Sequence, residues 1–233
     1  MIDGDQVDEP TPEGVDAPIV SKGSKFETFF DAPYNEIKGV LKDAVLPGQR
    51  VLDLGANKGN LEDFLDTLDS PLDVECVDTD EEALEELRVK KFENLAVGIV
   101  LADANEFIEG YTGDAIDVVL INATLHEINT PDNQREYLRH FFERMAAILT
   151  PEGKIIIGDY YYPDSVTDDE VARFMEYQLK AINHADTRNK FVKPDLLCEV
   201  GQESGFSVDQ SNEIKAVKEI DRRFYVVVLK KQK

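Results

Sequence analysis

The sequence predicts a doubly wound α/β fold, a mostly parallel sheet with helices on both faces. Short apolar runs of strand length alternate along the chain with segments whose apolar residues recur at helical spacing. One of these runs, at 50–54, leads into a turn with two glycines and then into an amphipathic segment. The chain has 233 residues, of which 42% are hydrophobic, enough to bury the core of one such domain.

The first strand and its turn carry the clearest local pattern. Residues 50–54 begin with Arg50 and continue as an apolar run that only Asp53 interrupts, and the turn that follows contains Gly55 and Gly59. The apolar residues after the turn fit one face of a helix: Leu61, Phe64, Leu65 and Leu68. Because glycine lets a backbone approach a ligand closely, the turn is predicted to line a binding site.

The glycine spacing separates two interpretations of this turn. A dinucleotide fingerprint has the form G-x-G-x-x-G. Here Gly55 and Gly59 are four residues apart, Asn57 stands in the middle, and Asp53 precedes the first glycine by two residues. Asn57 tolerates a left-handed backbone better than most residues, so the turn can keep its shape. A nicotinamide-dependent oxidoreductase therefore fits poorly but stays an alternative.

This D-x-G-x-x-x-G arrangement resembles the first motif of the class I S-adenosylmethionine-dependent methyltransferases, of the small-molecule type. Later segments resemble that family in order. The run 74–78 ends in Asp78, which lies 78 − 59 = 19 residues beyond Gly59, and Asp103-Ala104 matches the segment after strand three. Residues 117–128 resemble strand four and its loop, and 149–159 a helix end, a turn and strand five.

The resemblance implies a Rossmann-like sheet of seven strands with an antiparallel closing strand. It covers 50–159 well and the C-terminal part more loosely, with a last helix that stops near Gly205 and a final strand at 224–229. A helix in 24–48 is expected to cover the cofactor, and 164–190 is expected to form a lid-like insertion. We expect one domain over 24–233, preceded by an acidic, disordered tail at 1–23.

The implied cofactor is S-adenosylmethionine, which leaves as S-adenosylhomocysteine. In the family, the acid matching Asp78 holds the ribose hydroxyls, a task that suits an acceptor-only carboxylate. The acid matching Asp103 accepts from the adenine amino group, and Asn122 lies near the methionine moiety. Lys58 is expected either to approach the cofactor's carboxylate or to be solvated. The full set of expected cofactor residues is Asp53, Gly55, Asn57, Gly59, Asp78, Asp103, Ala104 and Asn122.

Methyl transfer from a sulfonium is an in-line displacement, so orientation supplies most of the acceleration. Two residues are predicted at the catalytic position. His126 follows strand four and is expected either to act as a base or to shape the pocket. Tyr160 opens a run of three tyrosines, where a ring can face the sulfonium or a cationic amine. Glu127 is expected to be a solvated loop acid, and no role is assigned to His140 or His184.

No metal is predicted. Asp159 and Asn122 resemble the strand-end residues of the metal-assisted catechol methyltransferases, but the sequence shows no acid triad that would complete such a site.

Charge narrows the choice of acceptor. The net charge is −23, with 48 acids against 25 bases, so a polyanion or an anionic membrane surface would be repelled. No nucleic acid and no membrane are expected as partners. The expected acceptor is a small molecule methylated on oxygen or nitrogen. A protein acceptor, or a non-catalytic module that only binds the cofactor, stays open.

Two cysteines, no signal peptide and no transmembrane run indicate the cytoplasm, and the oligomeric state is not predicted.

Overall fold

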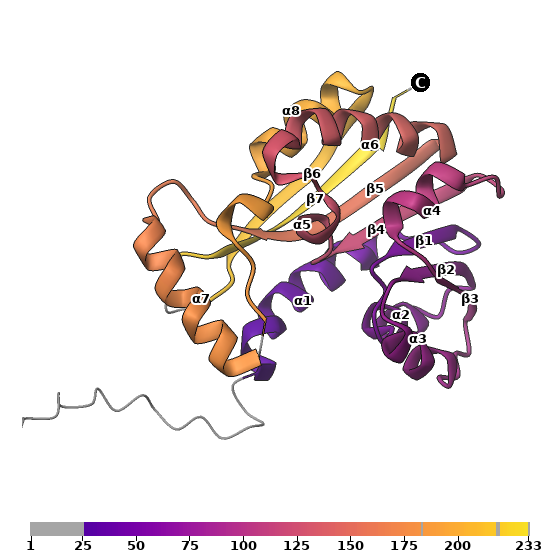
Figure 1. The fold of residues 1–233 in the computed structure, drawn as a ribbon. Coiled ribbons are helices and arrows are strands. Elements are labelled where there is room, and N and C mark those ends of the chain that lie inside the picture. Colours follow the sequence, from indigo (N-terminus) through magenta and orange to yellow (C-terminus); the bar gives the residue numbers. More distant parts are fainter. Residues whose placement is uncertain (1–25, 183, 218–219, 233) are drawn as a thin grey trace, which may run out of the picture.

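A computed structural model describes residues 26–182, 184–217 and 220–232. These residues contain one seven-stranded sheet with the order β3-β2-β1-β4-β5-β7-β6 (Figure 1). The predicted fold class is confirmed, since neighbouring strands from β3 to β5 are parallel and β7 pairs antiparallel with both β5 and β6. The tail expected at 1–23 lies outside the described residues. The strands are β1 (Arg50–Leu54), β2 (Leu72–Asp78), β3 (Leu95–Leu101), β4 (Ile116–Asn122), β5 (Leu149–Tyr161), β6 (Phe206–Lys215) and β7 (Arg223–Lys231).

Helices cover both faces of this sheet (Figure 1). One face carries α1 (Phe26–Ala44), α2 (Asn60–Asp66) and α3 (Glu81–Arg88), and the other carries α4 (Ala104–Gly110), α6 (Gln134–Ile148) and α8 (Pro194–Glu203). Because both faces are covered, the central strands are apolar along almost their whole length, and all of 51–54 and 118–121 is buried. None of the helices in the described ranges combines the length and the apolar character that a membrane crossing requires.

The segment predicted as a turn before strand five is part of that strand. β5 begins at Leu149, which pairs with Ile116, and the next pairing joins Lys154 to Val118. The intervening residues of β5 form an irregularity in the ladder rather than a separate turn. Space is short at this point, because a Cβ on Gly153 would lie 2.9 Å from the Leu149 side chain. The chain therefore bulges without leaving the sheet.

The insertion expected at 164–190 contains α7 (Asp168–Ile182), which lies outside both helix layers (Figure 1). Val171 and Phe174 are buried, whereas Leu179 is 50% exposed. The guanidinium of Arg188 ties the two ends of the insertion together by donating to the carbonyls of Val166 and Pro163, at 2.6 and 3.0 Å. The insertion thus forms one hydrogen-bonded unit at the end of the sheet.

Candidate functional site

A cavity of about 850 Å³ opens at the carboxyl ends of the strands. It lies where the strand order reverses between β1 and β4, the position where doubly wound sheets bind ligands. Of the eight predicted cofactor residues, Gly59 is the one outside the lining, and Tyr160 lines the cavity as well. Helix α1, from the segment expected to cover the cofactor, adds a wall with Asp31, Pro33 and Tyr34. The predicted lining residues are Asp53, Gly55, Asn57, Asp78, Asp103, Ala104, Asn122 and Tyr160.

The turn after β1 has three residues in the left-handed region. Gly55, Asn57 and Gly59 have φ of 86°, 50° and 74°, so the prediction that Asn57 tolerates this conformation is confirmed. A Cβ on Gly55 would lie 2.0 Å from Thr124 Oγ1, so only glycine fits there. Lys58 Nζ instead binds Glu86 Oε1 at 2.6 Å and is not part of the cavity lining.

Two carboxylates are held at the cavity by backbone N–H groups. Asp78 Oδ2 accepts from Asn57 N–H at 2.8 Å, and Asp78 Oδ1 accepts from Asp80 N–H at 2.9 Å. Asp103 is the N-cap of α4, and its Oδ1 accepts from the N–H groups of Asn105 and Glu106 at 2.9 and 3.1 Å. Its Oδ2 makes no hydrogen bond within the described ranges and is available to a donor. Both acids are therefore oriented before any ligand binds.

A buried pair of acids lies beneath the turn. Asp53 is 1% exposed and Glu62 is fully buried. The Cys76 thiol donates to Glu62 Oε1 at 3.3 Å. Burial, together with the charge of Glu62, raises the pKa of Asp53 well above its usual range. Asp53 Oδ1 and Glu62 Oε2 are buried without a hydrogen-bond partner among the described residues, so the raised pKa favours the protonated form of the Asp53 carboxyl group.

The end of β4 carries a hydrogen-bond acceptor, on Asn122, to which no described protein group donates. Asn122 Oδ1 is buried and has no hydrogen-bond partner among the described residues. The next residue, Ala123, has φ of 52°, a conformation that non-glycine residues rarely adopt. A buried acceptor without a partner is costly unless a ligand donates to it. The cavity therefore fits a ligand that brings donors to Asn122 and Asp103 and hydroxyls to Asp78.

Tyr160 lies at the far end of the cavity with one face of its ring already covered. The guanidinium carbon of Arg222 lies 4.2 Å from the Tyr160 ring centroid and 4.9 Å from that of Phe191. Arg222 is 7% exposed, and its Nε has no partner in the described part of the chain. Burial raises the pKa of Tyr160, so its hydroxyl stays protonated and can donate. Arg222 thus takes the cation position that the sequence had offered to a sulfonium or an amine on that face.

His126 is not part of the cavity lining. It lies on the one-turn helix α5 (Leu125–Ile128), is 6% exposed, and its Nδ1 lies 2.7 Å from Asp159 Oδ1. Its backbone N–H donates to Asp159 Oδ2 at 2.8 Å. Burial alone would lower the pKa of His126, but the carboxylates of Asp159 and Asp186 outweigh burial and raise it to about 10.

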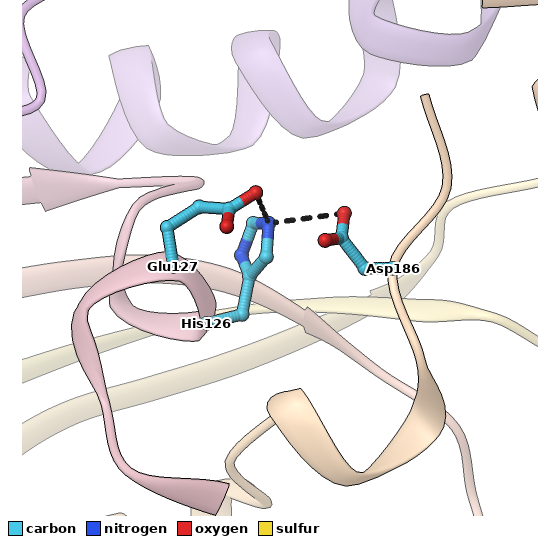
Figure 2. Close-up of side chains that lie close together, drawn as sticks. All are labelled: His126, Glu127 and Asp186. Carbon is cyan, nitrogen blue, oxygen red and sulfur yellow. Dashed lines mark ion pairs between the residues drawn. The ribbon is translucent and has the colours of Figure 1, made fainter. Parts of the chain in front are cut away.

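Figure 2 shows the other side of this ring, where His126 Nε2 faces Glu127 and Asp186. Nε2 lies 3.5 Å from Glu127 Oε1 and 3.5 Å from Asp186 Oδ2. The sequence showed no acid triad here, and the structure brings Asp186 of the insertion to Nε2, on the side of the ring opposite the Asp159 contact. Glu127, expected to be solvated, is 39% exposed and bound to Lys190 at 2.9 Å. His184 Nε2 lies 2.8 Å from Asp186 Oδ2. No sequence pattern pointed to Asp186, which lies about 60 residues from His126.

The comparisons agree with this geometry. The family described as methyltransferase domain matches residues 32–211. No curated protein sequence matches the chain. Among solved structures, the cyclopropane synthase MmaA2 from Mycobacterium tuberculosis is similar at 12% identity and a TM-score of 0.63, covering 84% of each chain. The cyclopropane synthase CmaA1, complexed with SAH and CTAB, has 13% identity, a TM-score of 0.64, and coverage of 89% of this chain and 87% of its own.

The N-methyltransferase NodS from Bradyrhizobium japonicum has 12% identity and a TM-score of 0.57, with 91% of this chain and all of its own chain covered. At these identities the structures support the fold.

Proposed function

Because the chain belongs to the methyltransferase-domain family, we propose that it is an S-adenosylmethionine-dependent methyltransferase that methylates an oxygen or nitrogen of a small-molecule acceptor. One observation carries the proposal. A single cavity of about 850 Å³ gathers residues from the ends of β1, β2 and β4 and from the segment after β3, and it continues to Tyr160 of β5. Its volume lies within the range of small-molecule sites.

The cofactor is proposed to lie along this series of residues. The Asp78 carboxylate would accept from the ribose hydroxyls and Asp103 Oδ2 from the adenine amino group. Asn122 Oδ1, which lacks a donor among the described residues, would accept from the methionine amino group. The acid pair of Asp53 and Glu62 lies beside that end, where its negative charge favours a cationic ligand. The bound cofactor supplies the electrophilic methyl group.

Orientation is the main contribution proposed for the protein at the methyl group. Tyr160 lines the cavity, and its protonated hydroxyl is proposed to hold an acceptor atom in line with the methyl. We propose His126 as a positioning residue, because both of its ring nitrogens face carboxylates and the ring is outside the lining. An acceptor that arrives as a free amine needs no base before the displacement.

The acceptor proposed is a small molecule and not a nucleic acid or a membrane lipid surface, since the net charge of −23 repels polyanions. The cytoplasm is the proposed compartment, in keeping with two free thiols, Cys76 and Cys198.

The direct test is S-adenosylhomocysteine formation by the full-length protein across an acceptor panel. The panel holds small amines, phenols and carboxylates, with a protein mixture and an unsaturated lipid as comparison acceptors. Turnover with a small oxygen or nitrogen acceptor supports the proposal. Tyr160→Phe should then raise KM for that acceptor while cofactor affinity is unchanged, and Tyr111→Phe, a tyrosine outside the cavity lining, is the matched control. Turnover with protein or lipid alone would contradict the proposal.

A further inference from the structure

We propose that His126, Glu127 and Asp186 bind a divalent transition-metal ion at the edge of the cavity, through His126 Nε2, Glu127 Oε1 and Asp186 Oδ2. These three atoms all lie within 4.8 Å of one another (Figure 2). They come from two separate parts of the chain, α5 and the segment after α7, so their convergence follows from the fold and not from local sequence.

The distances from His126 Nε2 to the two carboxylate oxygens match the separation of two ligands of one metal ion better than they match hydrogen-bond lengths. His126 Nε2 is 3.5 Å from each carboxylate oxygen, beyond the usual N–H···O range of about 2.7–3.2 Å. Two ligands bound tetrahedrally with bonds of about 2.0–2.2 Å lie about 3.4 Å apart. Nε2 therefore has the ligand spacing with each carboxylate oxygen, and the two oxygens, which lie within 4.8 Å of each other, would move closer together to bind the same ion.

The surrounding groups prepare the ligands. His126 Nδ1 faces Asp159 Oδ1 at 2.7 Å, and a metal-ligating histidine usually donates its other ring N–H to a carboxylate in this way. That contact fixes Nδ1 as a donor, so an ion that binds Nε2 displaces the other ring proton of the imidazolium. Lys190 Nζ binds the opposite oxygens of the two acids, Glu127 Oε2 at 2.9 Å and Asp186 Oδ1 at 3.0 Å. The inner oxygens stay directed toward the imidazole.

An imidazole with two carboxylates favours ions such as Zn²⁺ over Mg²⁺ or Ca²⁺, which prefer oxygen ligands alone. Three protein ligands leave one coordination position open. His184 Nε2 lies 3.4 Å from Glu127 Oε1 and forms a hydrogen bond of 2.8 Å with Asp186 Oδ2, which an ion bound at that oxygen would replace. Glu127 also lines the cavity, so an acceptor oxygen could fill the open position, a role that rests on the proposed function.

The test is calorimetric titration of the full-length, chelator-treated protein, without a histidine tag, with Zn²⁺ and separately with Mg²⁺. We expect one Zn²⁺ per chain, bound more tightly than Mg²⁺. Titration with Co²⁺ should give a visible absorption band. The position and intensity of that band report coordination by nitrogen and oxygen. Asp186→Asn and Glu127→Gln should each weaken Zn²⁺ binding by at least about tenfold.

Two control variants match these changes elsewhere on the chain. Asp164→Asn removes an exposed acid of the same insertion, and His140→Gln breaks an exposed His–carboxylate pair with Glu109. Neither should change Zn²⁺ affinity.

No Zn²⁺ binding, equal losses in the controls, or unchanged affinity in both Asp186→Asn and Glu127→Gln would overturn the proposal. Glu127→Gln, at a 39% exposed position, keeps the test informative if Asp186→Asn fails to fold. S-adenosylhomocysteine affinity measured on the same samples separates loss of the metal site from loss of the proposed function.

Discussion

Asp53 and Glu62 place two carboxyl groups together where water does not reach them. Asp53 has its pKa raised by burial first, and then by Glu62 and Asp78. As pH rises above about 3.8, the unfolded chain releases the Asp53 proton that the folded chain retains. The free energy of unfolding therefore falls with rising pH until the raised pKa is passed. The neighbouring Cys76 thiol stays protonated, because burial and Glu62 raise its pKa too.

Glu62→Gln should be more stable than the wild type, because it removes one of the two like charges while Gln can still accept from Cys76. The gain should grow between about pH 4 and pH 8, by about 1.4 kcal/mol for each unit by which the pKa of Asp53 falls. Urea denaturation at several pH values measures it. Glu143→Gln, on the exposed face of α6, is the control and should show no such trend. A pH-independent difference for Glu62→Gln would disprove that Glu62 raises the pKa of Asp53.

Gly55→Ala should destabilise the fold by about 1–3 kcal/mol, since φ of 86° is strained for alanine and the new Cβ would meet Thr124 at 2.0 Å. Chemical denaturation measures the loss. In Gly110→Ala the new Cβ meets nothing within 4 Å, so its stability should stay unchanged or rise slightly. Equal stability of the two variants would mean that the turn relaxes freely.

Single residues differ in how far the sequence predicts them. Asn57 was predictable because its left-handed φ depends on local backbone preference. The contact between His126 and Asp186 was not predictable, since Asp186 reaches the ring only when the insertion folds back toward α5. The same holds for Arg222 on the Tyr160 ring. A local motif carries no information about such long-range contacts.

Helix α4 uses one residue for two purposes, its N-cap and a cavity acid. Asp103→Ala should cost about 0.5–2 kcal/mol of stability, because the first turn loses its side-chain acceptor. Asp103→Asn keeps the cap, since Asn caps helices about as well as Asp. It should therefore keep its stability and still bind S-adenosylhomocysteine more weakly than the wild type. Thermal denaturation and calorimetry on both variants separate the two roles; wild-type affinity in Asp103→Asn would remove Asp103 from the site.

Strands were easier to predict than the connections between them. β1 has the predicted bounds because burial on both faces makes its residues apolar except Arg50 and Asp53, and Gly55 ends the strand. β5 includes the segment expected as a turn, because residues 149–153 bulge within the ladder. His126, expected in a loop, lies on a one-turn helix. The periodicity of apolar residues indicates which face of an element is buried. It does not indicate the conformation of the segment that connects two elements.

At the scale of the whole molecule, a net charge of −23 destabilises the folded state through repulsion. Two basic residues of β7 serve internal contacts, since Arg223 binds Asp221 and Glu213, and Lys230 binds Glu152. Between about 0.01 M and 1 M NaCl the Debye length shortens from about 30 Å to about 3 Å. Because the salt then screens the repulsion between the acids, Tm should rise over this range. Thermal scans in NaCl and in KCl measure this; a Tm that falls with both salts would show that attractive ion pairs dominate.

The central claim is that the cavity binds S-adenosylmethionine through the strand-end residues. Calorimetric titration of the full-length protein with S-adenosylhomocysteine tests it most directly, with NAD as the comparison ligand. We predict binding of S-adenosylhomocysteine alone. Asp78→Ala should weaken it by about 1.5–3 kcal/mol, because hydrogen bonds to a charged group are lost, whereas Asp114→Ala, at a surface ion pair, should not. Binding of NAD alone, or unchanged affinity in Asp78→Ala, would contradict the account.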